Sequence, residues 1–200
     1  MARSERSGGE DPERDEAFRQ ELVQLIPHLR AFARTLCGDA TAADDLAQDA
    51  MLKAWDARQS FEMGTNMKAW TFMILRNQFY SEKRRSWRQT QLDQEAAERT
   101  LVAVDDPEAP VALDELRQGL GMLPIEQREA LILVGAGGFA YEEAAAICEC
   151  AVGTVKSRVS RARRALQGIL ESGSYRRDGS AAGEAMASIL ADAERLSQAK

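Results

Sequence analysis

The chain has 200 residues, a formal net charge of -6, 44% apolar residues and 29% charged residues. At about 150 residues per domain this length allows one large or two small domains, and the composition excludes a wholly disordered or a fibrous chain. The longest uncharged stretch, near residues 69–75, is far shorter than the ~20 apolar residues that a membrane span requires, so we expect no bilayer helix.

The first residues alternate Arg with acidic residues and contain no apolar stretch of the kind that a secretory signal needs. We therefore expect a cytoplasmic protein in which residues 1–14 are disordered. An odd number of cysteines in such a chain predicts reduced thiols (Cys37, Cys148 and Cys150). A zinc site would need all three thiols and the single histidine, His28, so we expect no metal. We also expect no cofactor and no enzyme, because no phosphate-loop, nucleophile-elbow or metalloprotease motif is present.

Helical periodicity runs through most of the chain and predicts an all-α protein with two small domains. The first domain, residues 15–91, is expected to contain helices over 16–37, 41–58 and 66–88, and Thr41 with Asp44 forms a weak capping box at the start of the second. One face of that second helix mixes acidic and amide residues with a leucine (Asp45, Gln48, Asp49 and Leu52). This pattern favours a partner-binding surface, although single exposed leucines are common on solvated faces.

The helix expected over 66–88 changes character along its length. It is apolar almost all round from Met67 to Leu75, which predicts the centre of a bundle, and then becomes polar, aromatic and basic up to Arg85. Amides and aromatic rings beside cations are typical of surfaces that hold unpaired bases. The alternative is a set of core aromatics followed by a basic helix end that the helix dipole favours.

Residues 92–110 are rich in Asp and Glu, contain two prolines and offer few apolar residues to bury. We expect an acidic, flexible linker there, and the alternative is an extra surface helix over 92–101. At the other end of the chain, residues 172–183 are predicted to be a hinge. The tail up to residue 200 then spaces its apolar residues as a short amphipathic helix would (Met186, Ile189, Leu190 and Ala193).

The second domain, residues 111–171, is expected to contain helices over 111–122, 125–134, 141–148 and 154–170. The last two, joined by a short turn and with Thr154 as the N-cap of the second, predict a helix-turn-helix. At 100° per residue, the apolar residues of the final helix fall on one stripe and its polar and basic residues on the opposite face (Lys156, Ser157, Ser160, Arg161 and Arg164). Such a face suits the major groove of DNA, whereas a solvated basic face is the alternative.

These motifs resemble the extracytoplasmic-function sigma factors of bacterial RNA polymerase over about residues 22–170. The resemblance is carried by Asp44-Asp45-Leu46-Ala47-Gln48-Asp49 with Lys53-Ala54-Trp55, by Asn66-Met67-Lys68-Ala69-Trp70 with Arg76-Asn77 and Lys83-Arg84-Arg85, by Leu123-Pro124-Ile125-Glu126-Gln127-Arg128-Glu129-Ala130, and by Gly153-Thr154-Val155-Lys156-Ser157-Arg158. Finer similarity around residues 25–33 and 148–156 points to the general-stress-response group of alphaproteobacteria. One departure lies in the turn of the helix-turn-helix, where many such units have Gly and this chain has Glu149.

The resemblance implies a non-enzymatic initiation factor whose partners are core RNA polymerase, promoter DNA and an anti-sigma factor. It implies polymerase binding by the mixed face named above (Asp45, Gln48, Asp49 and Leu52). It implies contact with the minus-ten element by residues of the third helix (Asn66, Met67, Lys68, Arg76, Asn77, Lys83, Arg84 and Arg85). It implies contact with the minus-thirty-five element by the final helix (Lys156, Ser157, Arg158, Ser160, Arg161 and Arg164). A stand-alone helix-turn-helix regulator is the alternative function, but it would have no use for a docking face followed by a base-holding helix.

Overall fold

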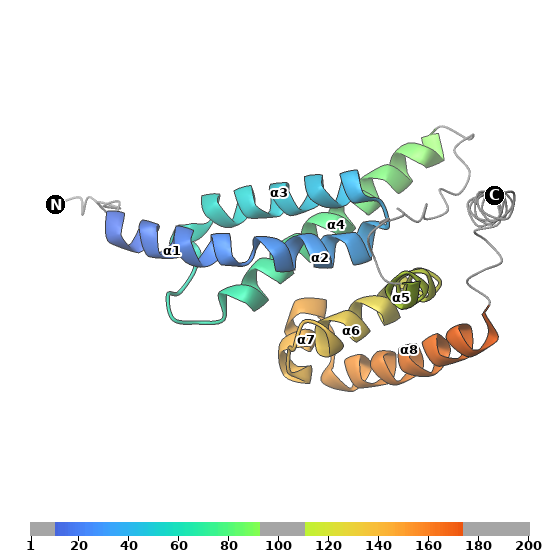
Figure 1. Cartoon of the computed structure of the whole chain (residues 1–200). Coiled ribbons are helices and arrows are strands. Elements are labelled where there is room, and N and C mark those ends of the chain that lie inside the picture. Colours follow the sequence, from blue (N-terminus) through green and yellow to red (C-terminus); the bar gives the residue numbers. More distant parts are fainter. Residues whose placement is uncertain (1–10, 93–110, 174–200) are drawn as a thin grey trace, which may run out of the picture.

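The computed structural model describes residues 11–92 and 111–173, and the regular secondary structure of these residues is helical (Figure 1). The first domain comprises α1 (Pro12–Gln24), α2 (Ile26–Cys37), α3 (Ala40–Asp56), the short 3-10 helix η1 (Arg58–Ser60) and α4 (Met67–Leu92). The second comprises α5 (Val111–Gly121), α6 (Ile125–Gly135), α7 (Tyr141–Cys148) and α8 (Val152–Ser172). The all-α prediction is confirmed. The linker is predicted over 92–110, and all of it except Leu92, the last residue of α4, lies outside the described residues, as does the chain beyond residue 173.

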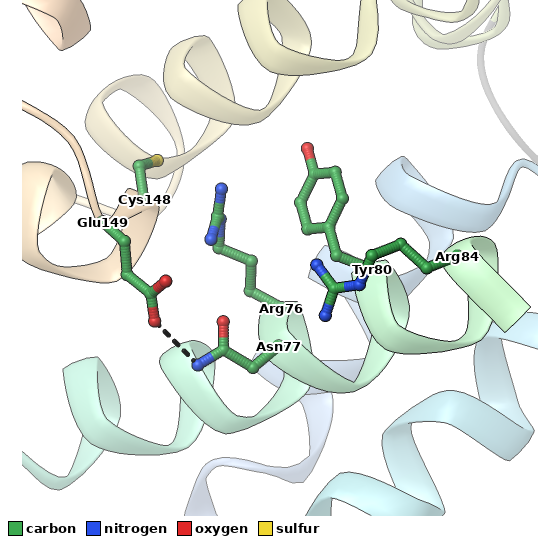
Figure 2. Close-up of a pocket in the computed structure, with 6 residues that line it drawn as sticks. All are labelled: Arg76, Asn77, Tyr80, Arg84, Cys148 and Glu149. Carbon is green, nitrogen blue, oxygen red and sulfur yellow. Dashed lines mark hydrogen bonds between the residues drawn. The ribbon is translucent and has the colours of Figure 1, made fainter.

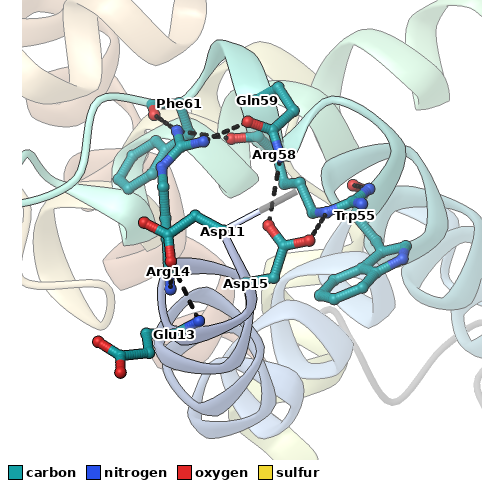
Figure 3. Close-up of polar contacts among 8 residues, drawn as sticks. All are labelled: Asp11, Glu13, Arg14, Asp15, Trp55, Arg58, Gln59 and Phe61. Atoms are coloured by element: carbon teal, nitrogen blue, oxygen red, sulfur yellow. Dashed lines mark hydrogen bonds and ion pairs between the residues drawn. The ribbon is translucent and has the colours of Figure 1, made fainter. Parts of the chain in front are cut away.

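Helix α1 begins at Pro12, so the expectation of disorder up to residue 14 is wrong for the end of that segment. The Asp11 side chain accepts hydrogen bonds from the backbone N–H groups of Glu13 and Arg14, and Pro12 occupies the first turn, where its missing N–H costs nothing. The Arg14 guanidinium then reaches the loop after η1 and donates to the Phe61 carbonyl at 2.8 Å (Figure 3). Local capping and this distant contact together order the segment.

The single helix expected over 16–37 is two helices, α1 and α2, because the chain breaks at Leu25. Pro27 explains the break: it has no N–H to donate, and its ring would clash with the carbonyl of Val23 in a continuous helix. The same proline is tolerated in the first turn of α2. At its far end α2 stops at Gly38, whose φ of 73° is the left-handed conformation that glycine adopts readily.

Two predicted N-caps are wrong by a few residues. Helix α3 is capped by Asp39, whose carboxylate accepts from the Ala42 N–H at 2.7 Å, rather than by Thr41. Helix α8 begins at Val152 instead of after Thr154, because the Ala151 carbonyl already accepts the N–H groups of Thr154 and Val155. Both threonines therefore lie inside the first turn of their helices.

The first domain is held together at its outer end by a cluster of aromatic rings around Phe18 of α1. The Phe18 ring lies 5.7 Å from that of Phe61, 6.0 Å from that of Trp70 and 6.1 Å from that of Trp55 (centroid distances). Beside this cluster, Arg58 pairs with Asp15 at 2.8 Å (Figure 3). Since Phe18 is only 1% exposed, α1 contributes to the core and is part of the domain.

The second domain is built on the packing of α8 against α6 and α7. The apolar stripe predicted for the final helix is confirmed: Val155, Val159 and Ala162 are buried. In the turn between α7 and α8, Glu149 has a φ of 51°. This is the left-handed conformation, which costs an L-residue roughly 1–2 kcal/mol relative to the right-handed one.

The two domains pack directly against each other, which the sequence did not predict. Helix α4 contacts α7, α2 contacts α6, and one hydrophobic cluster includes buried residues of both domains. At the junction the Phe72 ring of α4 meets the Phe139 ring, just before α7, at 5.1 Å and nearly edge-on. In Figure 1, α5–α8 accordingly lie beneath the bundle of α1–α4.

Candidate nucleic-acid interface

The outward face of α8 carries a group of polar and basic side chains, all of them exposed: Lys156, Ser157, Ser160, Arg161 and Arg164. Arg161 is held against its own helix, donating to the Ser157 hydroxyl at 3.1 Å, and the Lys156 ammonium lies 5.6 Å from the centre of the Tyr141 ring. Arg158 is different: it is half-buried, and its guanidinium approaches the Cys150 sulfur at 3.8 Å. Because the opposite stripe of α8 is buried in the core, this basic face points outward.

The candidate residues on and beside α4 divide into three groups. Lys83, Arg84 and Arg85, near the C-terminal end of the helix, are exposed. Met67 is 1% exposed and packs in the cluster around Phe18, so its side chain faces the core rather than solvent. The remaining candidates (Asn66, Lys68, Arg76 and Asn77) all bond to the second domain. The structure therefore does not bring the whole candidate set onto one open surface.

Arg76 and Glu129 form an ion pair across the domain junction. The Arg76 Nε lies 2.7 Å from a Glu129 carboxylate oxygen, and the Tyr80 hydroxyl donates to the other oxygen at 3.2 Å. Glu129 is completely buried. Burial raises the pKa of Glu129 above its usual value, opposed by the charge of Arg76 and by both hydrogen bonds. For Arg76, burial works against the charge, but Glu129, Cys148 and Tyr80 together outweigh burial and raise the pKa of the guanidinium.

A cavity of about 510 Å³ opens at this junction, beside the ion pair (Figure 2). Its walls come from α4 and from the end of α7, with Arg76, Asn77, Tyr80 and Arg84 on one side and Cys148 and Glu149 on the other. The Asn77 amide spans the gap and donates to the Glu149 carboxylate at 3.0 Å. In the described residues no group of His, Cys, Asp and Glu side chains is arranged to hold a metal ion.

The predicted partner-binding face of α3 is open to solvent. Asp45, Gln48 and Asp49 are exposed, and Leu52 between them is 56% exposed. The opposite face of α3 contributes Leu46, Ala47 and Ala50 to the core. An exposed leucine among acidic side chains on a rigid helix is a compact target for a partner with an apolar and basic surface.

Sequence reasoning missed the carboxylates of the second domain that meet α4: Glu129, Glu143 and Glu149. Glu129 carried one signal that could have identified it. It lies four residues before Leu133, so the helical period places it on the buried stripe of α6, where an acidic residue needs a partner. Glu143, on α7, and Glu149, in the turn after α7, are accessible to solvent and gave no comparable signal.

Across the described part of the chain, no helix has the length and apolar character needed to cross a membrane.

Comparison with known proteins identifies both domains. The family model "Sigma-70 region 2" matches residues 22–89, and "Sigma-70, region 4" matches residues 113–166. The chain is 47% identical to the ECF RNA polymerase sigma factor EcfG of Rhodopseudomonas palustris over 155 residues, which cover 78% of this chain and 86% of the relative. It is 34% identical to the ECF RNA polymerase sigma-E factor of Escherichia coli over 61% of this chain and 70% of that one.

A solved structure has a similar fold. The sigma factor RpoE of Bartonella quintana, solved in complex with the anti-sigma factor NepR, is 48% identical. The match has a TM-score of 0.72 and covers 78% of this chain and 98% of that one.

Proposed function

The chain belongs to the extracytoplasmic-function sigma factors of bacterial RNA polymerase, and we propose that it serves the general stress response, working in the cytoplasm under the control of an anti-sigma protein of the NepR type. The observation that carries the proposal is the pair of sigma regions, region 2 over residues 22–89 and region 4 over residues 113–166, together with the similarity to a sigma factor solved in complex with NepR. The protein supplies promoter recognition, and the polymerase supplies the chemistry of RNA synthesis.

Recognition of the minus-thirty-five element is assigned to the outward face of α8. Lys156 and Arg161 can donate to base edges or phosphates, and Ser157 and Ser160 are short enough to let the helix approach the floor of the groove. Arg164 lies further along the same face. Arg158, which is half-buried beside Cys150, has less reach and is assigned to the edge of this surface.

The minus-ten element is assigned to α4. Arg76 and Asn77 offer a guanidinium and an amide within one turn, and Tyr80 lies one turn further on, which supports recognition of an unpaired base. Lys83, Arg84 and Arg85 then supply the positive charge that attracts the DNA backbone. Asn66 and Lys68 extend the surface at the other end of the helix.

Docking on the polymerase is assigned to the α3 face formed by Asp45, Gln48, Asp49 and Leu52. Its exposed leucine and surrounding charge support a protein partner, and none of its residues belongs to either of the surfaces assigned to DNA.

Reconstituted transcription tests the DNA assignment. With core polymerase and a promoter selected for dependence on this chain, Lys156→Ala and Arg161→Ala are each expected to weaken promoter binding by about 1–3 kcal/mol if they read bases. Arg34→Ala removes an exposed cation from α2 and serves as the matched control. Equal loss of promoter binding in all three variants would contradict the assignment. If Lys156→Ala and Arg161→Ala instead weakened binding to unrelated DNA sequences by the same amount as to the promoter, these two residues would contact phosphates only.

Asp49→Lys tests the docking face, because it reverses one charge on an exposed position of α3. We expect weaker binding to core polymerase with an unchanged melting temperature, measured by co-purification and by circular dichroism. Glu21→Lys makes the same charge change on α1, away from the face, and is expected to bind core polymerase as the parent chain does. Normal binding by Asp49→Lys would remove α3 as the docking helix.

A further inference from the structure

Helix α4 exposes a tryptophan that none of the assignments above uses. The Trp87 side chain is 65% exposed, the highest value among the large apolar side chains of the described residues. The rings of Trp55 and Trp70 pack 6.1 and 6.0 Å from that of Phe18, whereas no described ring or cation lies against the Trp87 indole. Single exposed apolar residues are common on protein surfaces, so its neighbours decide what the indole can bind.

Those neighbours on the helix surface are cations. Lys83 and Arg84 are exposed and lie four and three residues before Trp87, which places both beside the indole. The single acidic residue of α4, Glu82, lies about 140° around the helix from Trp87, and its carboxylate accepts a hydrogen bond from Gln78. An open aromatic face beside positive charge suits a ligand with flat rings and negative charge, and nucleic acid combines the two.

Trp87 also continues the stripe of α4 that we assign to the separated strand. At about 100° per residue, Arg76, Tyr80 and Trp87 fall within about 40° of one another, with Arg84 beside them. Arg76, Tyr80 and Arg84 line the cavity at the domain junction (Figure 2). At a rise of about 1.5 Å per residue, Trp87 lies about 10 Å beyond Tyr80 along the helix axis. A strand that follows this stripe past Tyr80 and Arg84 therefore meets the indole next.

We propose that Trp87 binds the separated promoter strand by stacking its indole on an unpaired base, while Lys83 and Arg84 attract the neighbouring phosphates. The inference rests on the proposed function, because it takes α4 to be the helix that binds this strand. A base inside a duplex is already stacked on both faces, so the indole selects unpaired DNA. Every base has an aromatic face, so Trp87 adds affinity for the strand without selecting its sequence.

The contact can be tested on the full chain alone, because Lys83, Arg84 and Trp87 are all exposed. Fluorescence anisotropy at one fixed salt concentration measures binding to three fluorescein-labelled probes. The first is a single-stranded DNA of mixed sequence, the second a strand of the same length with abasic sites in place of its bases, and the third the duplex of the first. The abasic strand keeps the phosphates and removes the rings on which the indole would stack.

The variants separate the ring from other effects of substitution. Trp87→Ala removes the ring, and Trp87→Phe keeps an aromatic side chain at the same position. Val23→Ala is the matched control, since it shortens another exposed apolar side chain, 45% exposed on α1. Because both positions are exposed, circular dichroism is expected to give the parent melting temperature for all three variants.

Trp87→Ala is expected to bind the single strand about fivefold or more weakly than the parent chain, the loss that corresponds to one stacked base. Trp87→Phe and Val23→Ala are expected to bind it nearly as the parent does. All four chains should bind the abasic strand equally, and Trp87→Ala should bind the duplex as the parent does. Undetectable strand binding by the parent, unchanged strand binding by Trp87→Ala, or an equal loss on the abasic or duplex probe would overturn the proposal.

Tryptophan fluorescence gives a second readout, because an indole stacked on a base is quenched. Emission of the parent chain is expected to fall as unlabelled single strand is added and to stay constant with the abasic strand. Trp87→Phe keeps the packed Trp55 and Trp70 and is expected to show no fall. A fall of equal size in the parent and in Trp87→Phe would show that the strand does not reach Trp87.

Binding to core polymerase separates this inference from its rival and from the proposed function. Trp87→Ala is expected to co-purify with core polymerase as the parent does. Loss of core binding with normal strand binding would assign Trp87 to the polymerase and overturn the proposal. A parent chain that supports no promoter-dependent transcription would contradict the proposed function, whereas the strand-binding assays need no polymerase and report on Trp87 itself.

Discussion

At the scale of one residue, burial changes the pKa and hence the reactivity of the Cys148 thiol. It lines the cavity at the domain junction but is only 3% exposed, and burial, assisted by the charge of Glu129, raises the pKa of its thiol to about 12. Cys37 is affected in the same way, with burial raising its pKa to about 11. The thiolate is the nucleophile in cysteine chemistry, so both thiols should be unreactive in the folded chain.

This predicts a slow reaction of Cys148 with iodoacetamide. At about pH 8 a thiol with a pKa near 12 is about one part in ten thousand ionised, against about a quarter for an unperturbed cysteine, so we expect a rate on the order of a thousandfold lower. The protein is alkylated in buffer and, separately, in concentrated urea, and mass spectrometry of its peptides gives the ratio of the two Cys148 alkylation rates. Equal rates in the two conditions would show that the thiol reaches solvent in the folded protein.

At the scale of secondary-structure elements, the loop between α6 and α7 has little room for a side chain at Gly137. An ideal Cβ at Gly137 would lie 2.6 Å from the Leu133 carbonyl oxygen and 2.9 Å from a ring carbon of Phe139. Gly135, two residues earlier, has no atom within 4 Å of the same position. The loop therefore needs glycine at 137 for space, and this close turn is what presents the Gly137 carbonyl to Lys68.

Gly137→Ala is expected to destabilise the protein by about 1–3 kcal/mol, as other overpacking changes do. Gly135→Ala, at the end of α6, is expected to be neutral or slightly stabilising, because alanine favours the helix. Urea unfolding followed by circular dichroism compares the two free energies. If both alanine variants unfolded at the same urea concentration, the steric account of the loop would be wrong.

The positions of most helices could be predicted from the sequence because apolar residues recur at helical spacing and glycine or proline lies near several of the ends. The errors concern ends and breaks. Asp39 and Asp11 became caps because their carboxylates meet particular backbone N–H groups, and Pro27 broke a helix that the periodicity continued through. Cap choice depends on the path of the chain before the helix, which apolar periodicity does not encode.

At the scale of the whole molecule, the sequence predicted two domains and their surfaces but not their contact. Periodicity shows that Phe72 and the residues around Phe139 are apolar, yet it does not show which partner covers them. The resemblance to sigma factors implies that Lys68 and Arg76 contact DNA, and the same donors also suit oxygen acceptors of the second domain. The α8 face was easier to place, because its buried stripe fixes which side faces outward.

The shared cluster at the domain junction predicts that the chain unfolds as one unit. All three tryptophans belong to the first domain (Trp55, Trp70 and Trp87), so their fluorescence reports on that domain alone, whereas far-ultraviolet circular dichroism reports on both. Because Phe72 and Arg76 pack on the second domain, we expect the two urea transitions of the parent chain to coincide. Glu129→Gln is expected to separate them and Glu126→Gln to leave them together. Separate transitions in the parent chain would mean that the junction adds too little free energy to couple the domains.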